Sequence, residues 1–545
     1  MTPLRSSSRP LPPINWRWLH TLAVIGLILR LGLALGSEQI HHPDEIFQYL
    51  EQAHRWVFGY GYIPWEYRFG LRSWLLPSWI AAPLYLCKLL HWDQPHLYIP
   101  LVKTLACLGS LSVIYSTYFV GRNLSSERSG QLASLFTCCW YELIYVAPRV
   151  TPEVVSTYFF VLALAIATRR SPHPEPKTRP KTMWLWGLLW GVSSGLVVAL
   201  RLQYLPPLAV MVALVLWQQP KLIRNGGLVG MAIVLLGVGW LDAVTWGQPF
   251  SSYGQNYLFN KTYGVSSLFG IQPVYYFLES LTYASGGLWI GMLGFIKPVI
   301  DRGWLPLASA GIIVLSHSWI PHKEHRFIIL AIPLLLLVMA MVLDHYGSSR
   351  LTGSSRLTSE PSPSSRQPTW DPRRIFTPLL GTGKTAIATL LVLIIGLGGI
   401  VLPPAQGVYR GFYGSPLVGQ LYSLTTRQPT LDSYRILAQE PDLRGILNLA
   451  HPWFETGGYY YLHRDVPIYF AEHQSLWTGE TLGDYVSHII CRTDCPPAPG
   501  FQLWQTVGDL HIWRATVSPP VSKILDLDLK NVLQEGVDDR YKPPF

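Results

Sequence analysis

The strongest constraint on the fold of this chain is a series of long apolar stretches that recur along most of its length. A helix needs about 20 apolar residues to cross a bilayer, and about eleven stretches reach or approach this length. Only 14% of the residues are charged, against roughly 25% in a soluble domain. The sequence therefore predicts a mainly α-helical, polytopic membrane bundle. The expected spans are 17–36, 97–120, 129–147, 152–168, 183–200, 204–218, 227–246, 284–300, 304–319, 326–344 and 385–403.

Lys and Arg residues in the loops indicate the orientation of these spans. Basic residues collect in the cytosolic loops of membrane proteins. With a cytosolic N-terminus, the loops assigned to the cytosol carry pairs such as Arg169 and Arg170, or Lys221 and Arg224. These loops account for the formal charge of +10, so we expect no nucleic-acid partner. The segments predicted to lie outside the cytosol are 37–96, 247–283, 320–325 and 404–545.

Composition divides the chain into a membrane module, a linker and a tail. Residues 1–346 form the expected transmembrane module, and 37–96 is its first outside loop. Residues 347–384 contain much Ser, Pro and Arg, which predicts a disordered cytosolic linker before a last span at 385–403. Residues 404–545 contain short β-prone runs between Pro- and Gly-rich turns, so we expect a small extracytosolic α/β domain. These runs are 445–450, 466–471, 485–491 and 501–515.

Cys491 and Cys495 lie close together in this tail. If the tail is extracytosolic, we expect them to form a disulfide, because oxidising compartments favour that bond. The sequence has no second pair at zinc-site spacing, so we expect no metal centre. The other cysteines fall in or near the predicted spans, where they serve as small apolar side chains.

Two adjacent carboxylic acids, Asp44 and Glu45, follow the first predicted span and lie beside His41 and His42. Pro43 suits the first turn of a helix, and the apolar residues after it recur at helical spacing. We therefore expect a helix that lies flat in the membrane interface. One interpretation is that the acids complement the helix dipole, which is worth roughly 0.3–1 kcal/mol. The other is functional, since ionisable groups held near a membrane are candidate site residues.

A second cluster of ionisable residues lies just before a late span, where His322, Lys323, His325 and Arg326 surround Glu324. One interpretation is that the long basic side chains extend from the span end to the membrane interface. The functional interpretation is a clamp for the phosphate of a lipid-linked substrate, because cations stabilise the charge that grows on a leaving phosphate. Arginine adds bidentate geometry toward phosphate. In such a clamp Glu324 would hold Lys323 or Arg326 in place.

Both clusters fall on the predicted outside face, so we expect Asp44 and Arg326 to face one cavity. Glu66, later in the first outside loop, either pairs with Arg68 or Arg72 as a structural brace or contacts the substrate. Together these features suggest an enzyme acting on a charged, lipid-linked substrate at the bilayer surface. Two short outside turns either line the same cavity or anchor the ends of spans: 149–153 and 201–204.

The order and spacing of several motifs resemble glycosyltransferase family 22, the polyprenol-phosphate-mannose mannosyltransferases of the C-type membrane superfamily. The layout is most similar to the branch that adds the third mannose in GPI-anchor synthesis, over about residues 15–345. Tyr67 stands where that family usually has Trp, and Pro64 where it usually has Thr. The motifs that carry the resemblance are His42-Pro43-Asp44-Glu45-Ile46-Phe47-Gln48, 51–54, Phe58-Gly59-Tyr60-Gly61, Trp65-Glu66-Tyr67, Leu71-Arg72-Ser73 with Pro77, and His322-Lys323-Glu324-His325-Arg326-Phe327.

The resemblance implies transfer of mannose from a polyprenyl (dolichyl-type) phosphate to a glycan or glycolipid, with inversion to an α-linkage. It implies no nucleotide sugar, cofactor or metal. Asp44 is then the expected base, and Glu45 orients it or binds sugar hydroxyls. The implied location is the non-cytosolic face of a bacterial plasma membrane, or of the endoplasmic reticulum in a eukaryote. The residues expected to bind donor phosphate or substrate are His42, Glu66, Arg72, His322, Lys323, Glu324, His325 and Arg326.

Two alternative functions are considered: a transporter, and a transferase with a different sugar donor. A flippase for a polyprenyl-linked glycan would be expected to have paired half-structures and broken helices with charge at the membrane midplane. Here the charged clusters lie at span ends on one face. The second alternative is a C-type transferase that uses another lipid-phosphate sugar, and only a donor assay distinguishes it.

Overall fold

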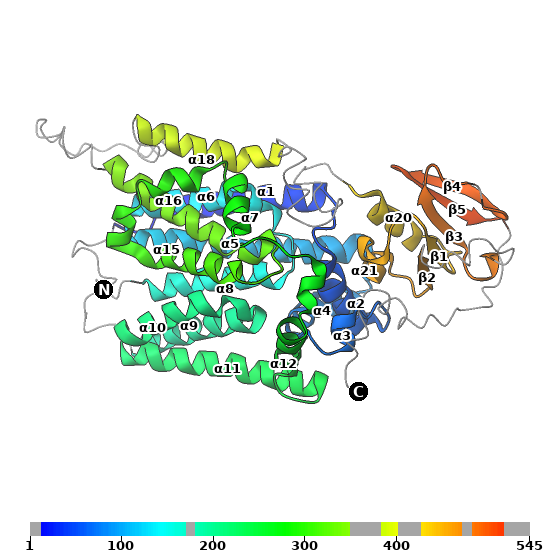
Figure 1. Ribbon diagram of the computed structural model, residues 1–545, viewed down its shortest axis with the longest axis horizontal. Coiled ribbons are helices and arrows are strands. Elements are labelled where there is room, and N and C mark those ends of the chain that lie inside the picture. Colours follow the sequence, from blue (N-terminus) through cyan, green and yellow to red (C-terminus); the bar gives the residue numbers. More distant parts are fainter. Residues whose placement is uncertain are drawn as a thin grey trace, which may run out of the picture.

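A computed structural model describes residues 12–169, 180–348, 383–401, 427–470, 482–496 and 498–516. Over these ranges the chain forms a bundle of roughly aligned helices with a small sheet-containing domain at one end (Figure 1). The predicted mainly α-helical fold is confirmed. Most of the linker predicted at 347–384 lies outside the described residues. The bundle helices are α1 (Trp16–Gly36), α5 (Pro95–Leu124), α6 (Glu127–Cys139), α8 (Pro152–Ala167), α9 (Pro180–Leu200), α10 (Leu205–Gln218), α11 (Lys221–Trp246), α15 (Lys297–Ser318), α16 (Ala331–Ser348) and α18 (Lys384–Val401).

Four described helices, α1, α5, α9 and α11, are long and apolar enough to cross a membrane. The apolar parts of α8, α10, α15, α16 and α18 are shorter, at 10–17 residues. Helices α9 and α11 approach each other closely through glycines. A Cβ added at Gly191 would lie 2.0 Å from the carbonyl oxygen of Gly227, so a larger residue there would force the helices apart.

The single span predicted at 284–300 is wrong. The chain there forms α13 (Tyr276–Ala284), α14 (Leu288–Leu293) and the start of α15. Gly286 and Gly287 adopt φ values of 58° and 79°, a left-handed conformation that ends a helix and suits glycine.

The span predicted at 129–147 is also interrupted, because α6 ends at Cys139 and α7 (Tyr141–Tyr145) begins after Trp140. Trp140 has an extended ψ of 120°. Arg30 of α1 donates to the carbonyl of Thr137 at 3.1 Å and to that of Cys138 at 3.3 Å. These carbonyls lack partners at a helix end, so the guanidinium satisfies them and stabilises the break.

The first outside loop forms a short π-helix, η1 (Glu45–Leu50), which continues into α2 (Glu51–Phe58), followed by α3 (Trp65–Arg68) and α4 (Leu75–Leu89). Every residue from Glu45 to His54 is buried. A helix forms where one was predicted, but from Glu45 to His54 it presents no polar face to solvent. It is enclosed because α4 covers one side and the C-terminal domain covers another.

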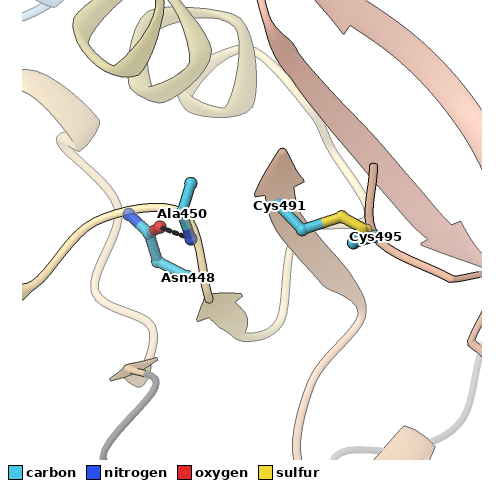
Figure 2. The surroundings of a disulfide bond; sticks show 4 residues. All are labelled: Asn448, Ala450, Cys491 and Cys495. Atoms are coloured by element: carbon cyan, nitrogen blue, oxygen red, sulfur yellow. Dashed lines mark hydrogen bonds between the residues drawn. A yellow bond between two sulfur atoms is a disulfide. The ribbon is translucent and has the colours of Figure 1, made fainter. Parts of the chain in front are cut away.

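The C-terminal domain contains a five-stranded sheet in the order β2-β1-β3-β5-β4. β1 pairs in parallel with β2 and β3, whereas β5 is antiparallel to β3 and β4. The predicted β-prone runs match these strands, and the last run forms a hairpin. A disulfide joins Cys491 of β3 to Cys495, and the turn that follows β1 lies beside β3 (Figure 2). The elements are α20 (Pro429–Ala438), α21 (Gly458–Leu462), β1 (Ile446–Asn448), β2 (Ile468–Phe470), β3 (His488–Arg492), β4 (Phe501–Val507) and β5 (Leu510–Ala515).

The segments predicted to lie outside gather at one end of the bundle (Figure 1). The first outside loop, α12 (Ser251–Tyr257) and the C-terminal domain all lie there. One hydrophobic core joins Phe47 of the loop and Tyr98 of α5 to Tyr434, Tyr460 and Ile490 of the domain. The domain is therefore built onto the same end of the bundle as the loop that carries Asp44.

Candidate active site

Asp44 lies where the chain leaves α1 and enters η1. Its side chain is 25% exposed, which makes it the most exposed of the carboxylates around Arg326. Its Oδ2 atom lies 2.6 Å from Nη2 of Arg326 and 3.4 Å from Nδ1 of His42. The two clusters that the sequence placed on one face are thus in direct contact.

Arg326 is the centre of this arrangement and is only 6% exposed. It lies in η5 (His325–Ile328), a 3₁₀ turn that precedes α16. Besides Asp44, it contacts Glu324 through Nε, and its Nη1 lies 3.9 Å from Oε1 of Glu153. Glu153 also pairs with Arg201 at 2.9 Å. Both short outside turns therefore reach the site, and one guanidinium contacts three carboxylates.

Glu324 connects Arg326 to two histidines. Its Oε1 lies 2.8 Å from Nε2 of His322, and its Oε2 lies 3.3 Å from Nε2 of His42. Nδ1 of His322 lies 3.0 Å from the carbonyl oxygen of Gly270. Both ring nitrogens of His322 therefore face acceptors, which favours the doubly protonated cation. Burial lowers the pKa of His322, but the Glu324 carboxylate outweighs burial, and the pKa is raised overall.

The neighbouring basic side chains keep the two central carboxylic acids ionised. Burial raises the pKa of Asp44, but His42 and Arg326 together outweigh it and hold that pKa well below its usual range. Burial likewise raises the pKa of Glu324, and Arg326 and His42 reverse the effect. Asp44 is therefore an anion with little tendency to take up a proton while Arg326 remains its partner.

Lys323 and His325 do not point into this cluster, contrary to expectation. Nζ of Lys323 donates to the carbonyl of Gln272 at 2.8 Å, and burial lowers its pKa. The His325 ring is buried among the helices, with Nε2 2.6 Å from Oε1 of Glu142 and Nδ1 2.9 Å from Oγ of Ser280. His325 and Arg326 are consecutive residues of the 3₁₀ turn η5, and such neighbours point in directions about 120° apart; Lys323 precedes the turn. Glu324 accordingly holds Arg326 and not Lys323.

Glu45 points away from Asp44. Its Oε2 lies 3.6 Å from Nη1 of Arg149, and its Oε1 accepts the backbone N–H of Val150 at 3.2 Å. Burial raises the pKa of Glu45 more than Arg149 lowers it. Glu45 and Arg149 line a separate hollow that Tyr460 also borders. Adjacent residues of a helical turn project about 100° apart. Glu45 therefore contacts Arg149 and Val150, and the expected contact with Asp44 is not made.

Glu66 is braced by an amide and not by Arg68. Gln48 donates to Oε1 of Glu66 at 2.6 Å, whereas Arg68 donates to the carbonyl of Ile63 at 3.0 Å. Burial raises the pKa of Glu66 to about 7, and the charge of Arg72 opposes this rise. The same charge contributes to the lowered pKa of Asp44. The positive charge of Arg72 therefore lowers the pKa of both Glu66 and Asp44.

Glu51 is a buried acid whose role the sequence did not indicate. Its Oε1 accepts the backbone N–H groups of Tyr62 at 2.7 Å and Tyr459 at 3.2 Å. Its Oε2 accepts that of Tyr460 at 2.8 Å. Nearby, Nε2 of His54 lies 2.9 Å from Nδ1 of His463. These contacts fasten α2 to α21, and no local sequence signal could predict partners about 400 residues away.

Helical bundle and site together define a polytopic membrane protein with a charge-dense site at one end of its helices. A model of the Alg9-like mannosyltransferase family matches residues 21–463. The chain belongs to this family.

Several relatives are named GPI mannosyltransferase 3, among them proteins of Trypanosoma brucei brucei and Yarrowia lipolytica. The Trypanosoma brucei brucei protein is 28% identical over 387 residues, which is 60% of this chain and 65% of that protein. The Yarrowia lipolytica protein is 25% identical, over 59% of this chain and 62% of that protein. The matches thus span slightly less than two thirds of these relatives. Both organisms are eukaryotes, so these two relatives give no support to the bacterial alternative among the expected locations.

A solved structure shares the fold across nearly the whole chain. It is ArnT from Cupriavidus metallidurans bound to undecaprenyl phosphate. The two structures superpose with a TM-score of 0.56 at 13% sequence identity, covering 92% of this chain and 98% of ArnT. At this identity the likeness concerns the arrangement of the helices and the C-terminal domain.

Proposed function

We propose that this protein is a membrane mannosyltransferase that uses a polyprenyl-phosphate-linked mannose as donor. It transfers the sugar to a hydroxyl of a glycan or glycolipid on the non-cytosolic face, with inversion to an α-linkage. The observation that carries the proposal is the contact of Asp44 with Arg326 at 2.6 Å, between residues 282 positions apart. A proton acceptor and a phosphate-binding cation are thereby adjacent at one end of the bundle.

Each group has a defined part in the proposed reaction. The acceptor oxygen bonds to C1 of mannose while the bond from C1 to the phosphate oxygen breaks. Asp44 takes the proton of the attacking hydroxyl, and polyprenyl phosphate leaves with one more negative charge. Arg326 and the protonated His322 stabilise that charge, and Arg72 adds a further positive field. Glu324 holds Arg326 and His322 in position.

Three further observations support this assignment. The chain belongs to a mannosyltransferase family. Its relatives include proteins named GPI mannosyltransferase 3. ArnT, whose fold it shares, was crystallised with undecaprenyl phosphate, a lipid phosphate of the kind proposed here as the leaving group.

A donor assay tests the proposal. The purified full-length protein in lipid nanodiscs is given polyprenyl-phosphate mannose with radiolabelled sugar and a panel of mannoside and glycolipid acceptors. We expect a labelled α-mannoside and one equivalent of polyprenyl phosphate. The same assay with glucose- or arabinose-linked donors tests the alternative sugars. Movement of a lipid-linked glycan across vesicles without release of polyprenyl phosphate would instead identify a flippase.

A further inference from the structure

Arg326 is positioned to serve both halves of the proposed reaction with a single guanidinium. Two of its partners, Glu324 and Glu153, are buried, at 12% and 2% side-chain exposure, and fix its position. Its third partner, Asp44, is the most exposed of the three at 25%. A phosphate that enters the site therefore meets Arg326 already occupied by the carboxylate that is proposed to act as base.

We propose that Arg326 changes partner during transfer, from the carboxylate of Asp44 to the phosphate of the lipid donor. Donor binding and the basicity of Asp44 then depend on each other. This inference rests on the proposed function, because it assumes that a lipid phosphate binds beside Asp44.

The movement of charge makes this exchange favourable at the moment of reaction. The donor is a phosphodiester with one negative charge, and the departing polyprenyl phosphate carries two once the C1–O bond is broken. In the same step Asp44 gains the acceptor proton and becomes neutral. Arg326 therefore loses its attraction to one partner as its attraction to the other grows, and an interaction that strengthens only in the transition state accelerates the chemical step.

The remaining surroundings of Asp44 are compatible with release from Arg326. When the guanidinium turns to phosphate, positive charge remains near the carboxylate, while nearby carboxylates and the entering phosphate raise its proton affinity. Asp44 then becomes a better base when the donor phosphate is in place. In the empty site, Arg326 pairs with Asp44 and disfavours proton uptake. The groups that act on Asp44 are His42, Tyr49, Glu66, Arg72, Glu153 and Arg326, and Glu324 contacts His42 and Arg326.

The exchange predicts an unusual effect of removing the proposed base. If Asp44 competes with phosphate for Arg326, Asp44→Asn frees the guanidinium and tightens the binding of polyprenyl phosphate. We expect about a tenfold lower dissociation constant, a cautious value for close charge pairs. The measurement is equilibrium binding of polyprenyl phosphate to the full-length protein in nanodiscs, and it does not depend on turnover.

Matched variants separate competition from a general loss of negative charge. Asp93→Asn removes a carboxylate in the turn between α4 and α5, outside the cluster around Arg326, so it should leave the dissociation constant unchanged. Arg326→Ala should weaken binding, and more strongly in the Asp44→Asn background than in the parent. Asp44→Ser should reproduce the gain, which guards against a folding defect specific to Asn.

The outcomes distinguish this inference from the proposed function. If the parent transfers mannose but Asp44→Asn and Asp44→Ser bind polyprenyl phosphate no more tightly than the parent, the exchange is refuted. An equal gain in Asp93→Asn would also refute it, because the effect would then be one of net charge. If the parent neither binds polyprenyl phosphate nor transfers mannose, the proposed function itself fails.

Discussion

At the scale of single residues, the chemistry of the site depends on how strongly Asp44 is held. Arg326 and His42 lower the pKa of its carboxyl group against the opposing effect of burial. An ionised carboxylate next to the attacking hydroxyl is correctly charged for a base, but a low pKa weakens its pull on the proton. In the proposed reaction, close positioning against the acceptor and the transfer of Arg326 to the donor phosphate compensate for this low pKa.

Asp44→Asn tests the role of the base. The substitution keeps the shape of the side chain and removes its ability to accept the proton. We expect mannosyl transfer to fall by about 10²–10⁴-fold, the usual contribution of a general base. Initial rates in nanodiscs measure the effect. Asp93→Asn, in the turn after α4, is the matched control and should keep the parent rate; transfer by Asp44→Asn near that rate would exclude Asp44 as the base.

The pH dependence of transfer follows from the lowered pKa of Asp44. A depressed folded pKa means that the ionised form persists as pH falls, and both its activity and its stabilising pairing are lost only below that pKa. We therefore expect Asp44 to cause no loss of kcat/KM between pH 8 and about pH 4.5, above the ordinary Asp value of about 3.9. In Arg326→Lys, whose weaker hold lets the pKa rise, the acid limb should move to higher pH. Identical acid limbs in the two proteins would contradict this account.

Sequence reasoning predicted that the two charged clusters of the candidate site meet, but not the direction of every side chain. The clusters around Asp44 and Arg326 could be predicted to meet because loop charges fixed their sidedness. Nothing local distinguished Arg326 from His325, although one contacts Asp44 and the other Glu142. Which of the two side chains faces Asp44 depends on the short 3₁₀ turn η5. The apolar pattern of the following span gives no sign of this turn.

At the scale of elements, hydropathy located apolar segments well but did not detect every break within them. Around 284–300 the break lies at Gly286 and Gly287. A Gly-Gly pair is typical of turns, so the sequence does contain a signal for this break. The break at Trp140 carried no such signal. It depends on Arg30, which lies 107 residues before Thr137 and caps the end of α6. Only the folded bundle supplies that cap.

Glu51 is predicted to hold the C-terminal domain against the first outside loop. Glu51→Ala leaves one buried and two partly buried N–H groups without their acceptor, and a buried group left unpaired costs about 1–3 kcal/mol. We expect a loss of roughly 2–4 kcal/mol in total, because water partly replaces the carboxylate. The measurement is thermal unfolding of the detergent-purified protein together with amide exchange at Tyr459 and Tyr460. Unchanged exchange at these two amides would show that the carboxylate does not fasten the domain.

The same residue predicts a pH dependence of this attachment. Burial raises the pKa of Glu51 from an ordinary 4.5 to about 7, despite its three N–H donors. The folded state therefore binds the proton more tightly than the unfolded state. The contribution of the protonated Glu51 side chain to the free energy of unfolding is fully present below about pH 4.5 and is lost as the pH rises through 7. Melting temperature between pH 5 and 8 measures this slope, and Glu51→Gln, which has no titrating group, should flatten it; an equal slope in both proteins would contradict the assignment.

At the scale of the whole molecule, the C-terminal domain and the first outside loop form one structural unit. Their side chains share a core that includes Phe47 and Tyr460, and Glu38 at the end of α1 pairs with Arg435 of α20. The helix that begins beside Asp44 is thus held from both sides, by the bundle and by the domain. The sequence predicted the domain and its β-strands, but not this attachment, because none of its contacts is local.

The loop charges predict that the end of the bundle that carries Asp44 lies outside the cytosol, and thiol labelling can test this orientation. Trp92 is 56% exposed and Phe454 is 39% exposed, and both lie at the end of the bundle that we assign to the outside. Lys221, at the start of α11, is exposed at the opposite end. A membrane-impermeant maleimide applied from the non-cytosolic side should label Trp92→Cys and Phe454→Cys, whereas Lys221→Cys should require permeabilisation. The native background should be low, because four cysteines are buried and the other two form a disulfide. Labelling of Trp92→Cys and Phe454→Cys from opposite sides would be incompatible with a site built jointly by the loop and the domain.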